Sequence, residues 1–134
     1  MAYSTQRRAA AFRVPTESEE QQALFQWAGL QRGKYPELDL LYHIPNGGNR
    51  SKAEAGRFKA EGVKAGVPDI CLPVARGCFH GLYVELKREK GSKTSDEQKR
   101  WIEKLSKQGY FAVVCRGWTK AAEAIVLYLN GGTP

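Results

Sequence analysis

The sequence predicts a single α/β domain. Its 134 residues, 42% of them hydrophobic, suffice for one domain with a buried core, and no internal repeat or second domain is visible. Segments with the apolar spacing of helices alternate along the chain with short apolar runs typical of strands. The predicted order is helix, strand, helix, strand, strand, helix, strand, helix.

The first 15 residues are predicted to form a flexible basic arm that precedes a folded domain over residues 16–134. Arg7, Arg8 and Arg13 lie among small residues in this arm, so it could contact a phosphate backbone. A role in solubility alone explains the same composition.

The first folded segment is a predicted helix over residues 16–31. It begins where Thr16 and Glu19 have the spacing of a capping box. A strand is predicted over residues 38–44, followed by a glycine-rich loop in which the backbone can approach a ligand closely. A second helix is predicted over residues 51–61.

The second half of the chain begins with two strands, predicted over residues 69–74 and 82–87, that pair antiparallel. A second capping box, at Thr94 and Glu97, opens a helix that ends before Gly109. The last two elements are a strand over residues 110–115 and a helix over residues 118–129.

Ionisable residues lie on the two paired strands, where a packed core would not favour them. The strand period of two places Glu85 and Lys87 on one face, and antiparallel pairing brings Asp69 next to Glu85. Two carboxylates can hold a hard divalent cation, while a lysine orients water or offsets charge on a phosphate. These residues therefore predict a metal-dependent nuclease. A solvated strand face and a simple Pro-Asp turn are the alternative interpretations.

The first predicted helix offers a further carboxylate. Glu17, Glu20, Leu24 and Trp27 are spaced as one stripe on the helix surface. One acid in the first turn can be explained by the helix dipole, and the other is a candidate for the metal site. The spacing does not distinguish between Glu17 and Glu20.

Gln98 is predicted to lie on the inner stripe of its helix, with Trp101, Ile102 and Leu105. A buried amide needs hydrogen-bond partners. A substrate phosphate or the water shell of the metal would serve, and so would a neighbouring backbone group. Both alternatives remain open from the sequence.

The net charge of +7 and the pI of about 9.5 predict a polyanionic partner, most commonly nucleic acid. Ribosomal proteins and simple binding modules share this balance, so charge alone predicts no reaction. Polar and basic residues crowd the predicted helix over residues 51–61 and its flanks, which makes it the candidate surface for a DNA backbone, although it could simply be exposed. These residues are Asn46, Arg50, Lys52, Arg57, Lys59 and Lys64.

Cys71, Cys78 and Cys115 lack the paired spacing of a zinc site and are predicted to be structural thiols. His43 is predicted to be a packed or hydrogen-bonded strand residue. The sequence has no apolar run of membrane length and no segment of signal-peptide type, so a soluble, intracellular, cytoplasmic protein is expected.

Several short motifs occur together in one order and spacing over residues 16–130. With them the chain resembles the stand-alone virus-type replication-repair nuclease (VRR-NUC) domains of the PD-(D/E)XK nuclease superfamily. The motifs are Thr16-Glu17 opening a helix that ends in Gln26-Trp27-Ala28, Ile44-Pro45-Asn46-Gly47-Gly48 with Arg50, Gly62-Val63-Lys64-Ala65-Gly66-Val67-Pro68-Asp69, Glu85-Leu86-Lys87, Gln98 with Trp101, and Gly109-Tyr110.

The resemblance implies a restriction-endonuclease-like fold, with a mixed central sheet flanked by helices. It implies that Asp69 and Glu85 ligate Mg²⁺ or Mn²⁺, with the Leu86 carbonyl as a further candidate ligand, and that Lys87 positions or activates the attacking water. Glu17 matches the helix-opening glutamate of the family, whereas Glu20 lies a turn nearer the apolar stripe. A homodimer with two active sites, similar to Holliday-junction resolvases, is also implied.

The expected reaction is hydrolysis of a DNA phosphodiester by metal-activated water, leaving a 5′-phosphate and a 3′-hydroxyl. A small basic nuclease without an obvious base-reading motif should recognise DNA structure more than sequence, so a four-way junction is the expected substrate. The alternatives are a flap, nick or general DNA endonuclease, a restriction enzyme, or a non-catalytic DNA-binding accessory module. A phage or prophage origin is implied by the resemblance alone.

Overall fold

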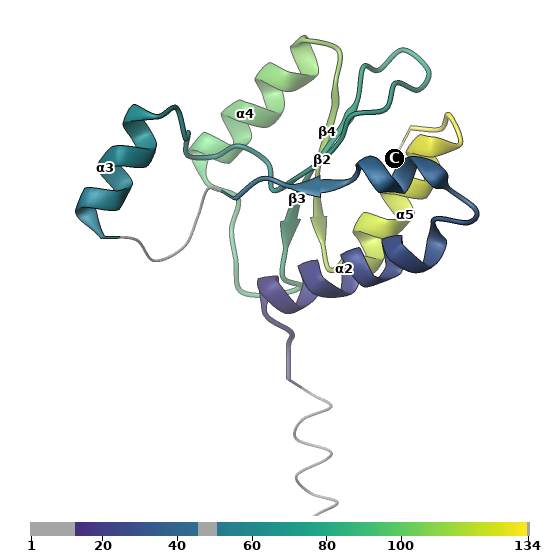
Figure 1. Ribbon diagram of the computed structural model, residues 1–134, viewed down its shortest axis with the longest axis horizontal. Coiled ribbons are helices and arrows are strands. Elements are labelled where there is room, and N and C mark those ends of the chain that lie inside the picture. Colours follow the sequence, from purple (N-terminus) through teal and green to yellow (C-terminus); the bar gives the residue numbers. More distant parts are fainter. Residues whose placement is uncertain (1–12, 46–50, 134) are drawn as a thin grey trace, which may run out of the picture.

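A computed structural model describes residues 13–45 and 51–133 (Figure 1). Apart from a short 3₁₀ helix, its elements follow the order predicted from the sequence. In chain order they are α2 (Glu17–Gln31), the 3₁₀ helix η1 (Pro36–Leu40), β1 (Tyr42–His43), α3 (Lys52–Ala60), β2 (Ile70–Leu72), β3 (Leu82–Lys87), α4 (Asp96–Lys107), β4 (Phe111–Arg116) and α5 (Trp118–Leu129).

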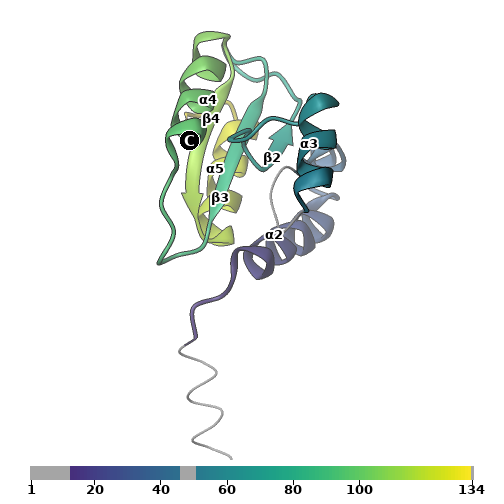
Figure 2. The same ribbon diagram turned by 90° about the vertical axis from the view of Figure 1, so that its left-hand side faces the viewer.

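The four strands form one mixed sheet in the order β1-β2-β3-β4. β2 pairs antiparallel with both β1 and β3, and β3 pairs parallel with β4. Parallel neighbours need a crossover connection, and α4 provides it. Helix α4 lies along β4, whereas α2 and α5 pack against each other and against β3 (Figures 1 and 2). The predicted fold, a mixed sheet flanked by helices, is therefore confirmed.

The hydrophobic core lies between the sheet and the helices α2 and α5. On β3, Leu82, Val84 and Leu86 are at most 1% exposed and belong to this core. Because side chains alternate along a strand, Glu85 and Lys87, which each follow a core residue, point to the other face. β3 can thus bury an apolar row and still present two charged groups at a site.

The strand predicted over residues 38–44 is wrong for most of its length. A 3₁₀ helix occupies Pro36–Leu40, and only Tyr42–His43 forms a strand. The proline at the start of the 3₁₀ helix fixes φ in the helical range. Leu38 and Leu41, three residues apart, are both buried, which is the spacing that a 3₁₀ turn places on one side.

Helix α3 projects from the body of the domain (Figures 1 and 2). Its bounds of Lys52–Ala60 agree with the prediction: Ser51 caps its start by accepting a hydrogen bond from the backbone N–H of Glu54 at 3.1 Å, and Gly62 follows its end. Within this helix every residue except Phe58 is exposed. Tertiary packing therefore contributes little to α3, and its basic side chains face solvent.

The capping box of α4 lies one residue later than predicted, at Ser95 and Gln98 rather than at Thr94 and Glu97. Ser95 Oγ accepts a hydrogen bond from the Gln98 backbone N–H at 3.2 Å, and Gln98 Oε1 accepts one from the Ser95 N–H at 2.9 Å. Glutamine serves in a capping box as glutamate does, so both registers satisfy the sequence pattern. The observed register gives Gln98 a structural partner.

The loop before β2 is held tightly against α4 at Gly66. This glycine has φ of +90°, and a Cβ there would lie 2.6 Å from the carbonyl carbon of Glu97. Gly62, with φ of +100°, has no atom within 4 Å of the corresponding position. A side chain at Gly62 would therefore cause backbone strain alone, whereas one at Gly66 would cause both backbone strain and steric overlap.

Gly66→Ala is expected to destabilise the protein clearly more than Gly62→Ala. Both changes force an alanine into the left-handed region, at a cost of about 1–2 kcal/mol, but only Gly66→Ala also displaces the loop from α4. Thermal unfolding of the two variants measures the difference. Equal losses of stability would show that the loop yields without cost and is not clamped to the helix.

None of the described helices is long and apolar enough to cross a membrane. Cys71, Cys78 and Cys115 are free thiols, and the first and last of them are buried within β2 and β4. Burial in strands agrees with the structural role predicted for these two.

Candidate metal centre

Asp69 immediately precedes β2 and lies beside the end of β3. The antiparallel register pairs Ile70 with Val84, which places Asp69 next to Glu85 as predicted. The Asp69 carboxylate accepts a hydrogen bond from the Leu86 backbone N–H at 2.9 Å through Oδ2. The strand pairing itself therefore orients this carboxylate.

The backbone of Asp69 is fixed from the other side by β1. Its carbonyl accepts a hydrogen bond from the Ile44 N–H at 2.6 Å, and it lies 3.0 Å from Nδ1 of His43. A carbonyl can only accept, so His43 carries its proton on Nδ1 at this contact. His43 is thus a hydrogen-bonded strand residue, as predicted, and it also holds a residue of the site.

Glu17 is the carboxylate of α2 that reaches this position. Thr16 forms the predicted capping box with Glu19, which makes Glu17 the first residue of the helix. Carboxylate oxygens of Glu17, Asp69 and Glu85 all lie within 4.8 Å of one another. We call these three residues the acidic cluster.

Glu20, the other candidate from α2, lies elsewhere. It is 4% exposed, and its Oε2 accepts a hydrogen bond from the Trp118 backbone N–H at 2.8 Å. Trp118 is the first residue of α5, whose N-cap, Gly117, has no side chain to satisfy the free N–H groups. Glu20 therefore caps a neighbouring helix and is not part of the acidic cluster.

The opposite roles of Glu17 and Glu20 can be tested with paired variants. Glu20→Ala is expected to lower stability by about 1–2 kcal/mol, because the start of α5 loses its cap, with little change in metal affinity. Glu17→Gln is expected to weaken metal binding with little loss of stability. Calorimetric Mn²⁺ titration and thermal unfolding distinguish the two. A larger loss of affinity in the Glu20 variant would reverse the assignment.

Lys87 supplies a buried positive charge beside the cluster. It is 6% exposed, and its Nζ lies 3.6 Å from Oε1 of Glu85. A buried ammonium group requires an opposite charge nearby, and the acidic cluster as a whole provides it, since Lys87 interacts electrostatically with all three of its carboxylates. The predicted placement of Glu85 and Lys87 on one face of β3 accounts for this pairing.

Gln98 connects α4 to the cluster. Its Nε2 donates a hydrogen bond to Oε1 of Glu85 at 2.8 Å, while its Oε1 is used in the capping box. Of the two partners that the sequence left open, the backbone group is present, and the amide also binds a carboxylate of the cluster. The cap thus fixes the orientation of the amide toward Glu85.

Glu85 Oε2 is the atom that best indicates what the site binds. It is buried, and no donor among the described residues forms a hydrogen bond with it. A buried carboxylate oxygen without a partner is costly. Carboxylate oxygens are the ligands that Mg²⁺ and other hard divalent cations take. The residues present therefore fit a divalent cation held by the acidic cluster.

The electrostatics of the cluster lead to the same conclusion. Burial, followed by the nearby charge of Asp69, raises the pKa of Glu85 to about 8, although Lys87 opposes the shift. Burial also raises the pKa of Asp69 and of Glu17. Like charges so close cannot all ionise without compensation. A divalent cation would supply that compensation and displace protons from the cluster.

The residues predicted to contact DNA are only partly described. Asn46 and Arg50 lie outside the described residues, as does most of the predicted arm. Lys52, Arg57 and Lys59 are exposed on α3, and the guanidinium carbon of Arg57 lies 5.2 Å from the ring centroid of Phe58. Lys64 follows α3 in the loop that leads to Asp69.

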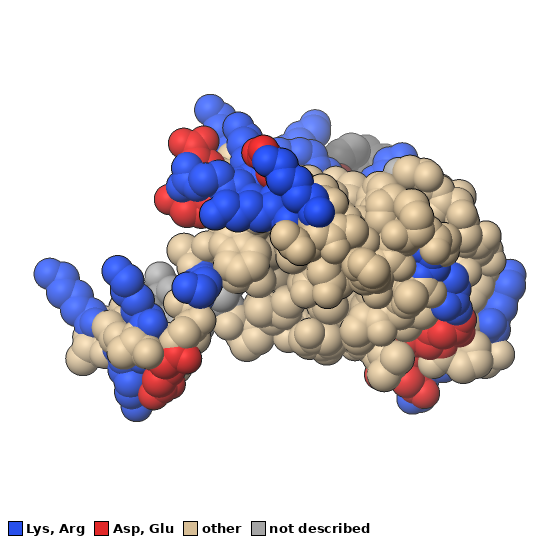
Figure 3. All heavy atoms as spheres, turned by 90° about the horizontal axis from the view of Figure 1, so that it is seen from above, with Lys and Arg blue, Asp and Glu red and all other residues tan. Residues whose placement is uncertain are grey.

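When the molecule is seen from above, two groups of lysine and arginine side chains lie on its left-hand side, and further ones lie at the right-hand end (Figure 3). One group lies on α3, and the other lies over α4 and the loop before it. Largely uncharged surface separates them. The second group was not predicted from the sequence, although Arg100 and Lys104 have the i,i+4 spacing that places two side chains on one helix face.

Comparison with known proteins gives the family. The model of the VRR-NUC domain matches residues 15–119. A solved structure described as a VRR_NUC domain protein is 37% identical in sequence, with a TM-score of 0.77, and the match covers 91% of this chain and 94% of that one. A search of curated proteins found no significant match. The resemblance seen in the sequence is confirmed, and the chain belongs to the VRR-NUC family of nuclease domains.

Proposed function

We propose that this nuclease is a metal-dependent DNA endonuclease that hydrolyses phosphodiester bonds with Mg²⁺ or Mn²⁺. The observation that carries the proposal is the unpartnered, buried Oε2 of Glu85, set among two further carboxylates and next to a buried lysine. The basic charge of the chain supports DNA as the polyanion.

The cluster residues have distinct roles in this proposal. Glu17, Asp69 and Glu85 would hold the cation, with the Leu86 carbonyl as a further candidate ligand. When bound, the cation lowers the pKa of water and offsets negative charge on the phosphate. Lys87 would place a positive charge near the phosphate oxygens on which negative charge develops, and it would position the attacking water. Gln98 fixes the Glu85 carboxylate through its hydrogen bond.

We further propose that the substrate is a branched DNA, with a four-way junction as the first choice. Structure-directed recognition is supported by basic groups on two separate helices, α3 and α4, which suit backbone contacts on more than one strand (Figure 3). Flap, nick or general duplex cleavage is the alternative within the same chemistry. A location inside a bacterial cell, with a phage or prophage origin, is proposed from the family alone.

A homodimer is part of the same proposal, because two sites are needed to cut two strands of a junction symmetrically. It is supported by apolar groups at the surface between α2 and α5. Leu127 is 49% exposed there and lines a groove together with Trp27 and Val126. Leu30 of α2 is 84% exposed. Sedimentation velocity of the full chain measures the oligomeric state.

A cleavage assay tests the proposal. Linear duplex, single strand, flap and four-way junction are incubated with Mg²⁺ or Mn²⁺ and either the native protein or Asp69→Asn. Asparagine can still accept the Leu86 hydrogen bond, so the fold is kept while a metal ligand is lost. The matched control is Asp39→Asn, an exposed acid with 62% of its side chain accessible.

Symmetric junction cuts that vanish only in Asp69→Asn would support the whole proposal. Cleavage of every substrate would keep the nuclease and remove the preference for junctions. Binding without cleavage under any metal would instead favour a DNA-binding accessory module.

A further inference from the structure

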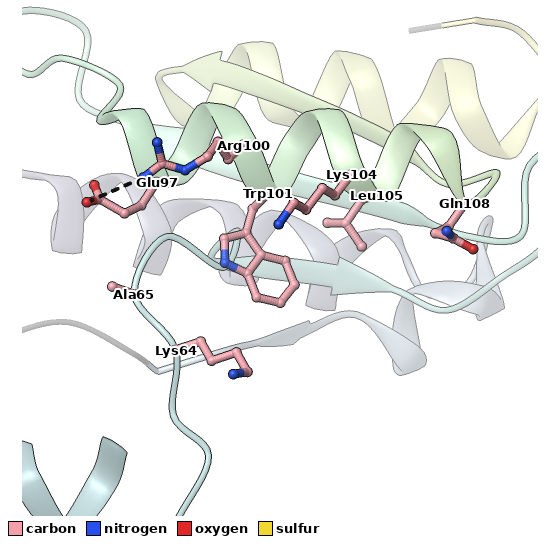
Figure 4. A pocket seen from close by; sticks show the side chains of 8 residues that line it. All are labelled: Lys64, Ala65, Glu97, Arg100, Trp101, Lys104, Leu105 and Gln108. Atoms are coloured by element: carbon pink, nitrogen blue, oxygen red, sulfur yellow. Dashed lines mark ion pairs between the residues drawn. The ribbon is translucent and has the colours of Figure 1, made fainter. Parts of the chain in front are cut away.

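A cavity of about 450 Å³ lies between α4 and the loop that leads from α3 to β2 (Figure 4). Its volume is within the range of about 300–1,000 Å³ that is typical of small-ligand sites. Trp101 and Leu105 give it an apolar wall, and Lys64, Arg100 and Lys104 are also among its lining residues. In Figure 4 the indole of Trp101 points from α4 toward the loop that carries Lys64.

Trp101 is not used in the main core. Among the described residues, Trp27 and Trp118 are partly buried and pack against the core, whereas Trp101 is partly buried without being part of that packing. An indole has a large apolar face, and tryptophan side chains dominate the energetics of the surfaces on which they lie. The ring of Trp101 is therefore placed to contact a flat ligand in the cavity.

The cavity and the acidic cluster share two elements, α4 and the loop before β2. Gln98 donates to Glu85, and Trp101 follows Gln98 by three residues, which is about 4.5 Å along a helix. On the opposite wall, the loop is clamped to α4 at Gly66 and continues directly to Asp69. The same helix and the same loop therefore carry both the cavity wall and residues next to the site that would hold the metal.

The charges around the cavity define the class of ligand. Three basic side chains and one acidic side chain, Glu97, line it. Arg100 is 61% exposed, with its guanidinium 3.8 Å from Glu97, so it can still reach a phosphate. A flat apolar wall with a basic rim matches a nucleobase with its flanking phosphates. An apolar peptide or a lipid tail would have no group to pair with these basic side chains.

We propose that this cavity binds an unpaired nucleotide of the DNA substrate, next to the bond that is cut. The base stacks on Trp101, while Arg100 and Lys104 contact the adjacent phosphates. This inference rests on the proposed function in one respect, that DNA is the substrate. A base within a continuous duplex is stacked on both faces and cannot enter without being flipped out, whereas a base at a branch point, flap or tail can.

Binding measurements without cleavage test the inference. A fluorescent duplex with a short single-stranded thymidine tail is compared with the same duplex with blunt ends, in EDTA, by anisotropy. Trp101→Leu is expected to weaken binding of the tailed duplex about 10-fold, in line with the contribution of one stacked base. Trp101→Phe keeps an aromatic face and should retain most of the affinity, and the blunt duplex should be bound equally by all three proteins.

Two further readings make the result specific. Addition of the tailed duplex should quench tryptophan fluorescence in the native protein but much less in Trp101→Phe, which retains Trp27 and Trp118. The double variant Arg100→Gln/Lys104→Gln changes only exposed side chains. It should reduce the slope of log affinity against log salt concentration for the tailed duplex, by the amount that corresponds to the loss of about one to two phosphate contacts.

Three results would overturn the inference. The first is unchanged affinity for the tailed duplex in Trp101→Leu, and the second is an equal loss for tailed and blunt duplexes. The third is a change from dimer to monomer in Trp101→Leu, which would place a second copy of the chain in the cavity. Cleavage of DNA without a Trp101-dependent tail preference leaves the nuclease intact and removes only this inference. Trp101-dependent tail binding by a protein that cuts no DNA would support this inference and remove the proposed nuclease activity.

Discussion

Replacing Lys87 by methionine is expected to lower the rate of DNA cleavage by about 10²–10³-fold, the effect typical of removing one charge-stabilising group from an active site. Metal affinity should be retained or increased, because the variant loses a positive charge 3.6 Å from a proposed ligand. Methionine preserves the unbranched apolar stem, so packing around this buried position is largely kept. Single-turnover cleavage and calorimetric Mn²⁺ titration measure the two effects separately.

The matched control is Lys90→Met, which removes the same charge from an exposed position in the following loop. It should leave both cleavage and metal affinity near their native values. If Lys87 only stabilised the fold, then cleavage, metal affinity and melting temperature would fall together in Lys87→Met. That pattern would contradict a role for the lysine in the reaction.

Glu85→Gln is expected to stabilise the metal-free protein at pH 8 while removing the stabilisation that metal gives. Burial and the charge of Asp69 raise the pKa of Glu85 from 4.5 to about 8, so the folded state binds a proton more tightly than the unfolded state. Between these two values the folded protein carries more bound protons, and stability therefore falls as the pH rises. Glutamine is neutral at every pH and escapes this loss.

Thermal unfolding from pH 5 to pH 8 in EDTA measures this effect. The melting temperature of the native protein should fall across that range, and Glu85→Gln should fall less and melt several degrees higher at pH 8. Added Mg²⁺ should reverse the order, because only the native cluster binds it. Glu103→Gln, with 67% of its glutamate side chain exposed, is the control. Parallel pH profiles for native protein and Glu85→Gln would show that Glu85 is ionised without a cation.

Features set by local signals could be predicted from the sequence. The capping box at Thr16 fixes the start of α2, and the alternation along Leu82–Lys87 fixes which side of β3 carries Glu85 and Lys87. The proximity of Asp69 and Glu85 follows from the hairpin, because antiparallel pairing leaves one register that buries the apolar row. The proximity of the main residues of the candidate site could therefore be predicted from the sequence.

Features set by tertiary contacts could not be predicted in this way. Glu17 and Glu20 lie on the same helical stripe, and the choice between them depends on the start of α5, which is 98 residues away from Glu20 and invisible to any local pattern. Trp101 had the spacing of a core residue on α4. It lines a cavity instead, opposite the loop that carries Lys64 and Ala65, and local spacing does not show where such a loop will lie.

Glu17, Asp69 and Glu85 are proposed to hold one divalent cation together. Calorimetric titration of Mn²⁺ into the full chain tests this proposal most directly, with Asp69→Asn and the control Asp39→Asn measured beside the native protein. We predict Mn²⁺ binding in the native protein and in Asp39→Asn, with affinity rising between pH 6 and pH 8 as protons leave the cluster, and a loss of about 10-fold or more in Asp69→Asn. Equal Mn²⁺ affinity in Asp69→Asn and the native protein would show that the acidic cluster does not hold the cation.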